Sequence, residues 1–196
     1  MKRRKLIGSY LIVVEGESEQ LYFEGLKSRL PREYARQVNI KIEKAKPGDA
    51  LTFVRSAIKK KRLLDIANVY VVFDYDNFKN IDKAFELARK NDIKVIFSKV
   101  CFELWLLLHF EYTTASFNKC DDLIKNRLNK YIDYAKAGDY DAFYSNLHQA
   151  LKNTQRLRNW IQENYTNAPL WSLPTYTNID LLVKEVFSKV MDAEEK

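Results

Sequence analysis

The stretch YLIVVEGESEQLYFEGL, residues 10–26, joins a short apolar run to a group of acids. Its apolar part, 10–14, is continuous and does not alternate with polar residues, which is typical of a strand buried on both faces of a sheet. Glu15 and Gly16 follow at once, and a helical pattern begins near residue 18. A buried strand that leads through an acidic loop into a helix indicates an α/β fold.

The rest of the first half repeats this alternation of strands and helices. Two further continuous runs are VYVVF (69–73) and IKVIF (93–97), and VNIKIE (38–43) alternates like a strand near an edge. Helical patterns lie between the strands, at roughly 18–30, 49–64 and 79–90. Asp49 is the expected N-cap of the second helix. The alternation predicts a parallel sheet of about four strands that is flanked by helices.

The second half of the chain has helical patterns and no further strand pattern. CFELWLLLHF (101–110) is an apolar helix, and a loop with two prolines covers 167–178. The other helices are expected at about 117–134, 139–164 and 179–193. We therefore expect an α/β core over 1–112 and a helical extension packed on that core over 113–196.

Composition limits the classes of function. Of the 196 residues, 46% are hydrophobic, and Lys and Arg outnumber Asp and Glu by 33 to 26, which gives a net charge of +7. An excess of positive charge weakly favours an anionic partner such as nucleic acid. Because no segment approaches the roughly 18 apolar residues of a membrane span, we expect a cytoplasmic protein with no membrane partner.

The two cysteines, Cys101 and Cys120, have neither a CxxC spacing nor a spacing with histidine that is typical of zinc ligands. In a cytoplasmic protein such cysteines are expected to be reduced. The sequence therefore predicts two separate thiols and no zinc site.

Polar side chains follow each of the three continuous apolar runs. Glu15 follows the first run, Asp74 and Asp76 follow the second, and Ser98 and Lys99 follow the third. Ligands of open parallel sheets bind outside the carboxyl ends of the strands. Two carboxylates at a spacing of two residues share a face in extended chain and repel each other unless they are protonated or bridged by a cation. This pattern predicts a site for Mg²⁺ or Mn²⁺.

Each of these motifs also has a plainer interpretation. EGESEQ (15–20) alone is typical of a well-capped helix start, in which Ser18 is the cap and Glu19 complements the helix dipole. DYD (74–76) alone is typical of a solvated turn. Gly16 would let the backbone turn sharply near a phosphate or metal. The site is favoured because all three strand ends project to one side.

Glu103 shares a helical face with Leu106, Leu107 and Phe110. A buried acid is costly unless it is paired or bound to a cation. Two interpretations are open: Glu103 lines the metal pocket, or it forms an ion pair with a Lys or Arg at the edge of the core. His109, near the end of the same helix, is expected to have no chemical role.

These motifs together resemble the Toprim domain, which topoisomerases, bacterial primases, recombination proteins and OLD-type nucleases share. More narrowly, they are similar to the RloB-like (abortive-infection AbiL second-component) family. The motifs that carry the resemblance are VVEGESEQLYFEGL (13–26), VFDYDN (72–77), FELWLLLHFE (102–111) and PTYTNIDLLVKEV (174–186). The resemblance covers most of the chain and implies a Toprim-like nuclease that is encoded beside an ATPase and used in bacterial antiphage defence.

The resemblance also assigns residues. Glu15 matches the Toprim glutamate, and Asp74 and Asp76 match the metal-binding pair. Relatives are expected to have Ser-Asn-Pro where this chain has Ser98-Lys99-Val100, so Ser98 is the only residue carried over from that loop. With the buried acid of the following helix, the predicted catalytic set is Glu15, Asp74, Asp76, Ser98 and Glu103.

Two functions are compatible with this set. The first is a nuclease in which Asp74 and Asp76 bind Mg²⁺ or Mn²⁺ and Glu15 is a ligand or general base, with DNA or RNA, including tRNA, as substrate. The second is a non-catalytic Toprim-fold sensor or regulatory partner of an ATPase. Basic residues predicted to bind nucleic acid are Lys59, Lys60, Lys99, Lys152 and Arg156. The alternative for each basic cluster is a solvated face.

Overall fold

The structure is a computed structural model, and it describes residues 7–75, 80–134 and 140–194. The chain divides into two compact units that alternate along the sequence. The first unit comprises Met1–Phe73, Asn77–Ile96 and Leu182–Lys196. The second unit comprises Asp74–Asp76 and Phe97–Leu181.

The sheet has four parallel strands in the order β2-β1-β3-β4. The strands are β1 (Gly8–Val14), β2 (Val38–Lys44), β3 (Asn68–Tyr75) and β4 (Lys94–Lys99). All four lie where the sequence predicted strands, and the predicted α/β class is confirmed. Two strands run two residues past their predicted ends at 73 and 97: β3 continues through Asp74 and Tyr75, and β4 through Ser98 and Lys99.

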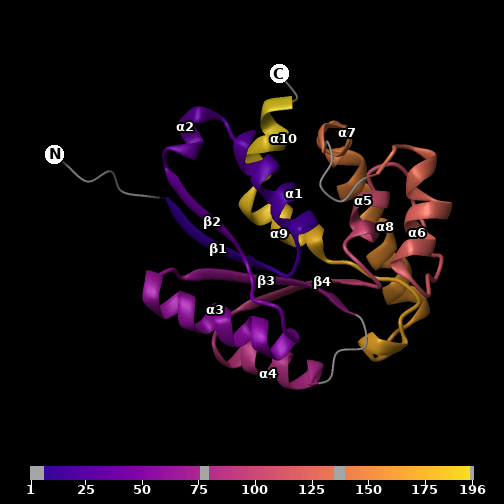
Figure 1. The fold of residues 1–196 in the computed structure, drawn as a ribbon. Helices are drawn as coiled ribbons and strands as arrows, with labels where there is room; N and C mark the ends of the chain where they lie inside the picture. The colour runs from indigo at the N-terminus through magenta and orange to yellow at the C-terminus, as the bar shows by residue number, and fades with distance from the viewer. Residues whose placement is uncertain (1–6, 76–79, 135–139, 195–196) are drawn as a thin grey trace. The chain divides into compact units, whose positions relative to one another are not determined.

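Helices cover both faces of the sheet in the first unit (Figure 1). The helices that lie wholly in this unit are α1 (Glu17–Ser28), the short α2 (Arg32–Ala35), which buries no residue, α3 (Ala50–Leu64), α4 (Ile81–Lys90) and α10 (Ser188–Glu194). On one face, the Phe73 ring of β3 packs against Phe53 of α3 and Phe85 of α4. On the other, Phe23 of α1 stacks on Phe187, which directly precedes α10. Because both faces are covered, the core-forming residues 11–14 of β1 are fully buried, as their continuous apolar pattern predicted.

The sequence predicted N-cap residues for two helices, α3 and α1. At α3 the prediction is confirmed, because the Asp49 carboxylate accepts a hydrogen bond from the Thr52 backbone N–H at 2.8 Å. At α1 the prediction is wrong. The N-cap residue is Gly16, which makes no side-chain cap hydrogen bond, and Ser18 lies inside the first turn. Glu19 also lies in that turn, as expected for an acid near the positive end of the helix dipole.

The second unit is mainly helical, with shorter helices than the sequence predicted. It contains α5 (Glu103–Leu107), α6 (Cys120–Asn126), η1 (Leu128–Lys130), α7 (Asp141–Tyr144), α8 (Leu147–Asn164) and η2 (Leu170–Ser172), and α9 (Ile179–Val186) begins in it. Its core includes an aromatic cluster in which the Phe143 ring contacts the rings of His109, Phe110, Tyr134 and Tyr140. Within the described residues, no helix combines the length and apolar character that crossing a membrane requires.

Candidate functional site

Two of the predicted metal ligands, Glu15 and Asp74, are described in the structure, and both are partly exposed. Glu15 follows β1 directly, and its backbone N–H donates a hydrogen bond to the Val72 carbonyl of β3 at 3.1 Å. Val72 is also the register partner of Val14, the last residue of β1. Asp74 lies two residues beyond Val72 in β3. Asp76, the third predicted ligand, lies outside the described residues, so the full set stays a prediction.

The donor chemistry of Glu15 and Asp74 fits the predicted ion. Both side chains are carboxylates, and both retain contact with solvent. Mg²⁺ and Mn²⁺ prefer oxygen ligands, and Mg²⁺ keeps several water molecules in protein sites. A partly exposed carboxylate at a strand end therefore suits a hydrated hard cation.

Gly16 has a different structural role from the predicted one. The chain bends at Glu15 and Gly16 as predicted, but the Gly16 backbone has φ −119° and ψ −177°, a conformation that any residue adopts, so the bend itself does not require glycine. Glycine matters here for another reason: a Cβ atom on Gly16 would lie 2.7 Å from Oε2 of Glu19, so a side chain at this position would require the Glu19 carboxylate to move. Glu19 is only 4% exposed. The glycine thus makes room for a buried carboxylate in the first turn of α1.

Ser98, the predicted catalytic hydroxyl, is buried by an extended segment of the second unit. Its Oγ lies 2.8 Å from Oγ1 of Thr177, and the two residues form an antiparallel bridge. Next to this bridge, the Phe97 backbone N–H donates a hydrogen bond to the Asn178 side-chain oxygen at 2.7 Å. The predicted loop 167–178 therefore pairs at its end with β4, a contact that no local pattern indicated. These contacts account for the burial of Ser98, and its catalytic role stays a prediction.

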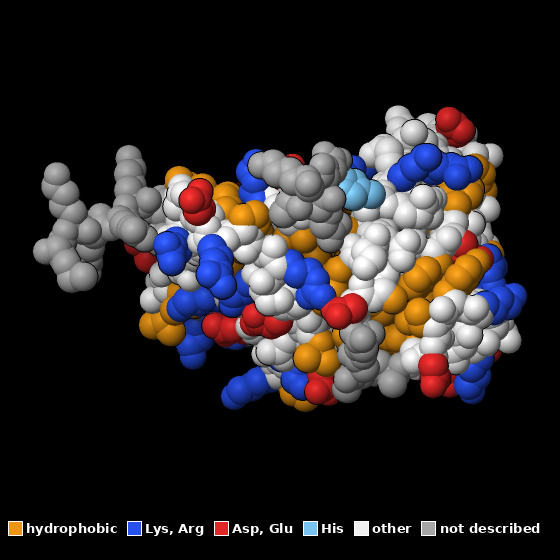
Figure 2. All heavy atoms as spheres, turned by 90° about the horizontal axis from the view of Figure 1, so that it is seen from above, with side chains coloured by type: hydrophobic (Ala, Val, Ile, Leu, Met, Phe, Trp, Pro, Cys, Tyr) orange, Lys and Arg blue, Asp and Glu red, His pale blue; other side chains and the backbone are white. Residues whose placement is uncertain are grey.

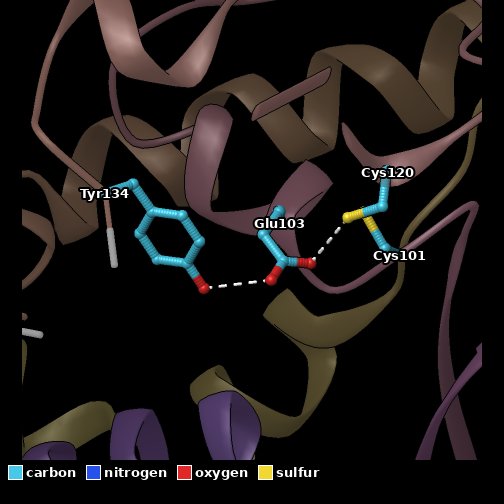
Figure 3. Close-up of a disulfide and its surroundings, with 4 residues drawn as sticks. All are labelled: Cys101, Glu103, Cys120 and Tyr134. Carbon is cyan, nitrogen blue, oxygen red and sulfur yellow. Dashed lines mark hydrogen bonds between the residues drawn. A yellow bond between two sulfur atoms is a disulfide. The ribbon is translucent and has the colours of Figure 1, made fainter. Parts of the chain in front are cut away.

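Glu103 is buried, as its helical face predicted, with 3% exposure. Its Oε1 accepts a hydrogen bond from the Tyr134 hydroxyl at 3.0 Å, and its Oε2 lies 3.0 Å from Sγ of Cys120 (Figure 3). Among the described residues, no Lys or Arg forms the ion pair with Glu103 that was one of the two interpretations.

The two cysteines are bonded to each other, so the prediction of separate reduced thiols is wrong for this structure. Cys101 precedes α5, and Cys120 begins α6. Packing in the second unit brings their Cα atoms to 5.7 Å although 19 positions separate them in the chain. Sequence reasoning missed that Cys101, Glu103 and Cys120 form one cluster, in which the potential ligand atoms all lie within 4.8 Å of one another. The available signal was the motif CFE (101–103), which places a thiol and an acid two residues apart.

His109 is fully buried on the same stretch of chain. Its Nδ1–H donates a hydrogen bond to the Trp105 carbonyl at 2.9 Å. Burial lowers the pKa of His109 to about 3, because the charged imidazolium would lose its hydration. The imidazole is therefore neutral at neutral pH.

The predicted nucleic-acid-binding residues of α3 differ in their contacts. Lys59 is exposed, whereas Lys60 forms an ion pair with Glu43 of β2. The neighbouring Lys61 donates hydrogen bonds to the backbone carbonyls of Asn91 and Asp92. Of the two predicted residues, Lys59 is the one whose side chain is exposed.

The predicted basic residues of the second unit lie on β4 and α8. Lys152 and Arg156 are both exposed on α8, and the Arg156 guanidinium lies 4.1 Å from the centre of the Tyr112 ring. Burial lowers the pKa of Lys99. On the face drawn in Figure 2, Lys and Arg side chains occur in several separate groups, with acids between some of them. These groups fit the weak field that the net charge predicted.

The sheet order, with a carboxylate after β1 and another near the end of β3, defines an α/β fold of the Toprim type. The family model described as RloB-like protein matches residues 10–186, which is nearly the whole chain. The chain therefore belongs to the RloB-like family. A search of curated proteins found no match to this sequence.

Proposed function

We propose that this RloB-like protein is a Toprim nuclease that hydrolyses phosphodiester bonds of DNA or RNA with the help of Mg²⁺ or Mn²⁺. The observation that carries the proposal is the register of β1 and β3. Glu15 follows the strand that ends at Val14, and Asp74 lies two residues beyond Val72, the register partner of Val14. Carboxylates at the ends of neighbouring parallel strands are placed where ligands of such sheets bind.

In this proposal each carboxylate has a defined role. Asp74 and Asp76 hold the cation, and Glu15 either completes the ligand set or accepts the proton of the attacking water. When bound, the cation supplies a water of lowered pKa and stabilises the leaving oxygen. Without a bound cation, the negative charge of these carboxylates would repel a polyanion from the strand ends.

The proposal extends to biological context. We infer from the family that the protein acts in bacterial antiphage defence together with an ATPase encoded nearby. An assay with both DNA and RNA substrates, including tRNA, distinguishes between the two classes of nucleic acid. Lys59, Lys152 and Arg156 are proposed to guide the nucleic acid because their side chains are exposed.

The test combines metal binding with cleavage. Wild-type protein, alone and co-purified with the ATPase, is titrated with Mn²⁺ by calorimetry and incubated with mixed DNA and RNA substrates. Cleavage should require Mg²⁺ or Mn²⁺ and stop with EDTA. Asp74→Asn should weaken metal binding, because it removes a charge from a hard-cation site. Asp82→Asn is the matched control, since Asp82 is an exposed acid at the start of α4.

Two results would contradict the nuclease proposal. If the complex binds no divalent metal, or if Asp74→Asn cleaves as well as the control variant, the chain is not a metal-dependent nuclease. The non-catalytic sensor or regulatory partner of an ATPase then becomes the better description.

A further inference from the structure

The cluster around Glu103 joins two sulfur atoms and a carboxylate in the second unit (Figure 3). Cys101 and Glu103 are buried, and Cys120 is partly exposed. The carboxylate is held from two sides: Oε1 accepts a hydrogen bond from Tyr134, and Oε2 lies 3.0 Å from the Cys120 sulfur. A buried acid is therefore fixed with one oxygen directed at a sulfur.

The contact between Glu103 and Cys120 depends on the redox state of the sulfur. A sulfur in a disulfide carries no hydrogen, so it cannot donate to the carboxylate. A free thiol at the same place would donate a hydrogen bond to Oε2. The oxidised state thus leaves Oε2 of a buried acid against a sulfur that offers no proton, which indicates that the reduced state suits this carboxylate better.

The reduced state brings a different electrostatic problem. With the disulfide closed, the two sulfurs and the carboxylate oxygen lie within 4.8 Å of one another, so after reduction two ionised thiols would stay close to each other and to the carboxylate. Like charges at such separations repel strongly in a buried site. A dication among the three ligand atoms removes this repulsion, and it also satisfies an acid for which no Lys or Arg partner is found in the described part of the chain.

We propose that Cys101, Glu103 and Cys120 form a redox-gated Zn²⁺ site, which the disulfide closes and a thiol reductant opens. The reductant thiolate attacks Sγ of Cys120, the sulfur–sulfur bond breaks, and Cys101 leaves as a thiolate that takes up a proton. A second reductant thiol then releases Cys120, so that one reductant disulfide forms and two protein thiols result. Binding of Zn²⁺ to these thiols and to the Glu103 carboxylate releases two protons.

Zn²⁺ is the expected metal because the ligand set mixes sulfur and oxygen. Thiolates select Zn²⁺ over hard cations such as Mg²⁺, which prefer oxygen ligands only. Three protein ligands leave one position of a tetrahedral site for water. The partial exposure of Cys120 gives both the reductant and the metal a route to the cluster. The zinc site shares no residue with the carboxylates proposed to bind Mg²⁺.

The experiment uses the full chain in two redox states. One sample is oxidised, the other is reduced with a phosphine and freed of reductant, and both are exposed to Zn²⁺ and then desalted. The reduced protein should retain one Zn²⁺ per chain and release it when a thiol oxidant is added. With Co²⁺ as a probe, thiolate ligation should give a sulfur-to-cobalt charge-transfer band, which oxygen ligands alone do not produce.

Variants separate the ligand roles. Glu103→Gln should weaken Zn²⁺ binding to the reduced protein by at least about tenfold. Loss of a residue that only orients a metal ligand already lowers metal affinity by about 10–100-fold, so loss of a ligand should cost at least as much. The matched control is Asp122→Asn, an equal loss of charge at an exposed acid of α6, and it should bind Zn²⁺ as tightly as wild type. The comparison of oxidised and reduced wild type needs no substitution, so a variant that fails to fold does not prevent the test.

Two results would overturn the proposal. Equal Zn²⁺ retention by oxidised and reduced wild type would show that the thiols are not ligands. Wild-type affinity in Glu103→Gln would show that the carboxylate is not one.

Discussion

The strand ends and the α5 region both carry acids at positions where a cation could bind, but they hold them in different ways. Glu15 and Asp74 are partly exposed carboxylates at the ends of parallel strands. Glu103 is buried between a tyrosine hydroxyl and a disulfide, and the neighbouring His109 is fully buried. The first region offers oxygen ligands to solvent, whereas the second offers a mixed sulfur and oxygen set under cover.

The two regions differ in the exposure of their polar side chains, and exposure determines how each group is hydrated. A partly exposed carboxylate retains its hydration and can exchange water for a ligand at little cost. The buried His109 has lost that hydration, so its protonation state is coupled to folding. Substitutions at the strand ends should therefore alter chemistry, and substitutions in the α5 region should alter stability and redox behaviour.

The largest expected effect is on the chemical step. Glu15→Gln keeps the shape of the side chain but removes its charge and its basicity. If Glu15 is the general base, cleavage at saturating Mg²⁺ should fall by about 10²–10⁴-fold, while the thermal midpoint stays close to that of wild type. Single-turnover cleavage measures the first quantity, and a thermal melt measures the second.

The control for Glu15 lies two residues away. Glu17 is exposed in the first turn of α1, so Glu17→Gln makes the same change of charge without touching the proposed base. Activity close to wild type is expected. If both variants lose the same activity, the effect is a general one of charge, and Glu15 has no special role in the reaction.

The fold of the first unit was largely predictable because its strands depend on local patterns. A run such as VYVVF (69–73) must be buried on both faces, and this requirement identifies a central strand without reference to the rest of the chain. Strand ends were less predictable. The apolar run stops at Phe73, so the predicted strand ended there, whereas β3 continues through Asp74 and Tyr75.

The helical half was predicted less well, since helical periodicity continues across breaks. The predicted helix 179–193 is divided into α9 and α10 at Phe187, whose ring stacks on Phe23 of α1. The predicted helix 117–134 ends as α6 at Asn126. The break at Phe187 coincides with a contact between residues distant in sequence, and a local pattern carries no information about such contacts.

Of the candidate sites, the strand-end acids were predictable and the sulfur cluster was not. A carboxylate after an apolar run is visible in the sequence, and the burial of Glu103 followed from its helical face. The pairing of Cys101 with Cys120 required knowledge of how α5 packs against α6. No spacing rule covers two cysteines 19 positions apart.

The next largest effect is expected in the buried region, where the free energy of unfolding should depend on pH through His109. The pKa of His109 is lowered by burial to about 3 in the folded protein, against an ordinary value of 6.5. Between these values the unfolded chain binds more protons, so the free energy of unfolding rises with pH. The contribution is fully present above about pH 6.5 and is lost as the pH falls toward about 3.

The measurement is urea unfolding at two pH values. Lowering the pH from about 7 to about 5 should reduce the free energy of unfolding by about 2 kcal/mol through His109. His109→Asn keeps a donor for the Trp105 carbonyl but does not titrate in this range, so it should lose most of this dependence. His148 is exposed, and His148→Asn should retain it. Equal pH dependence in all three proteins would contradict the assignment.

The smallest effect concerns the surface field around α8. Lys152 and Arg156 lie one helical turn apart, and both are exposed. The Arg156 guanidinium lies over the Tyr112 ring, and stacking of this kind fixes an arginine while its N–H edge stays free for a phosphate. The alternative remains that this face is only solvated.

Neutralising both residues distinguishes a phosphate contact from a solvated face. Each phosphate contact that is lost should reduce the slope of log affinity against log salt by about 0.9 for duplex DNA, because fewer counterions are released. Lys152→Gln/Arg156→Gln should therefore flatten the slope by up to about 1.8. Lys83→Gln/Arg89→Gln removes the same charge from exposed positions of α4 and should change the slope less. Slopes that fall equally in both double variants would mean that net charge alone attracts the nucleic acid, and that α8 makes no specific contact with it.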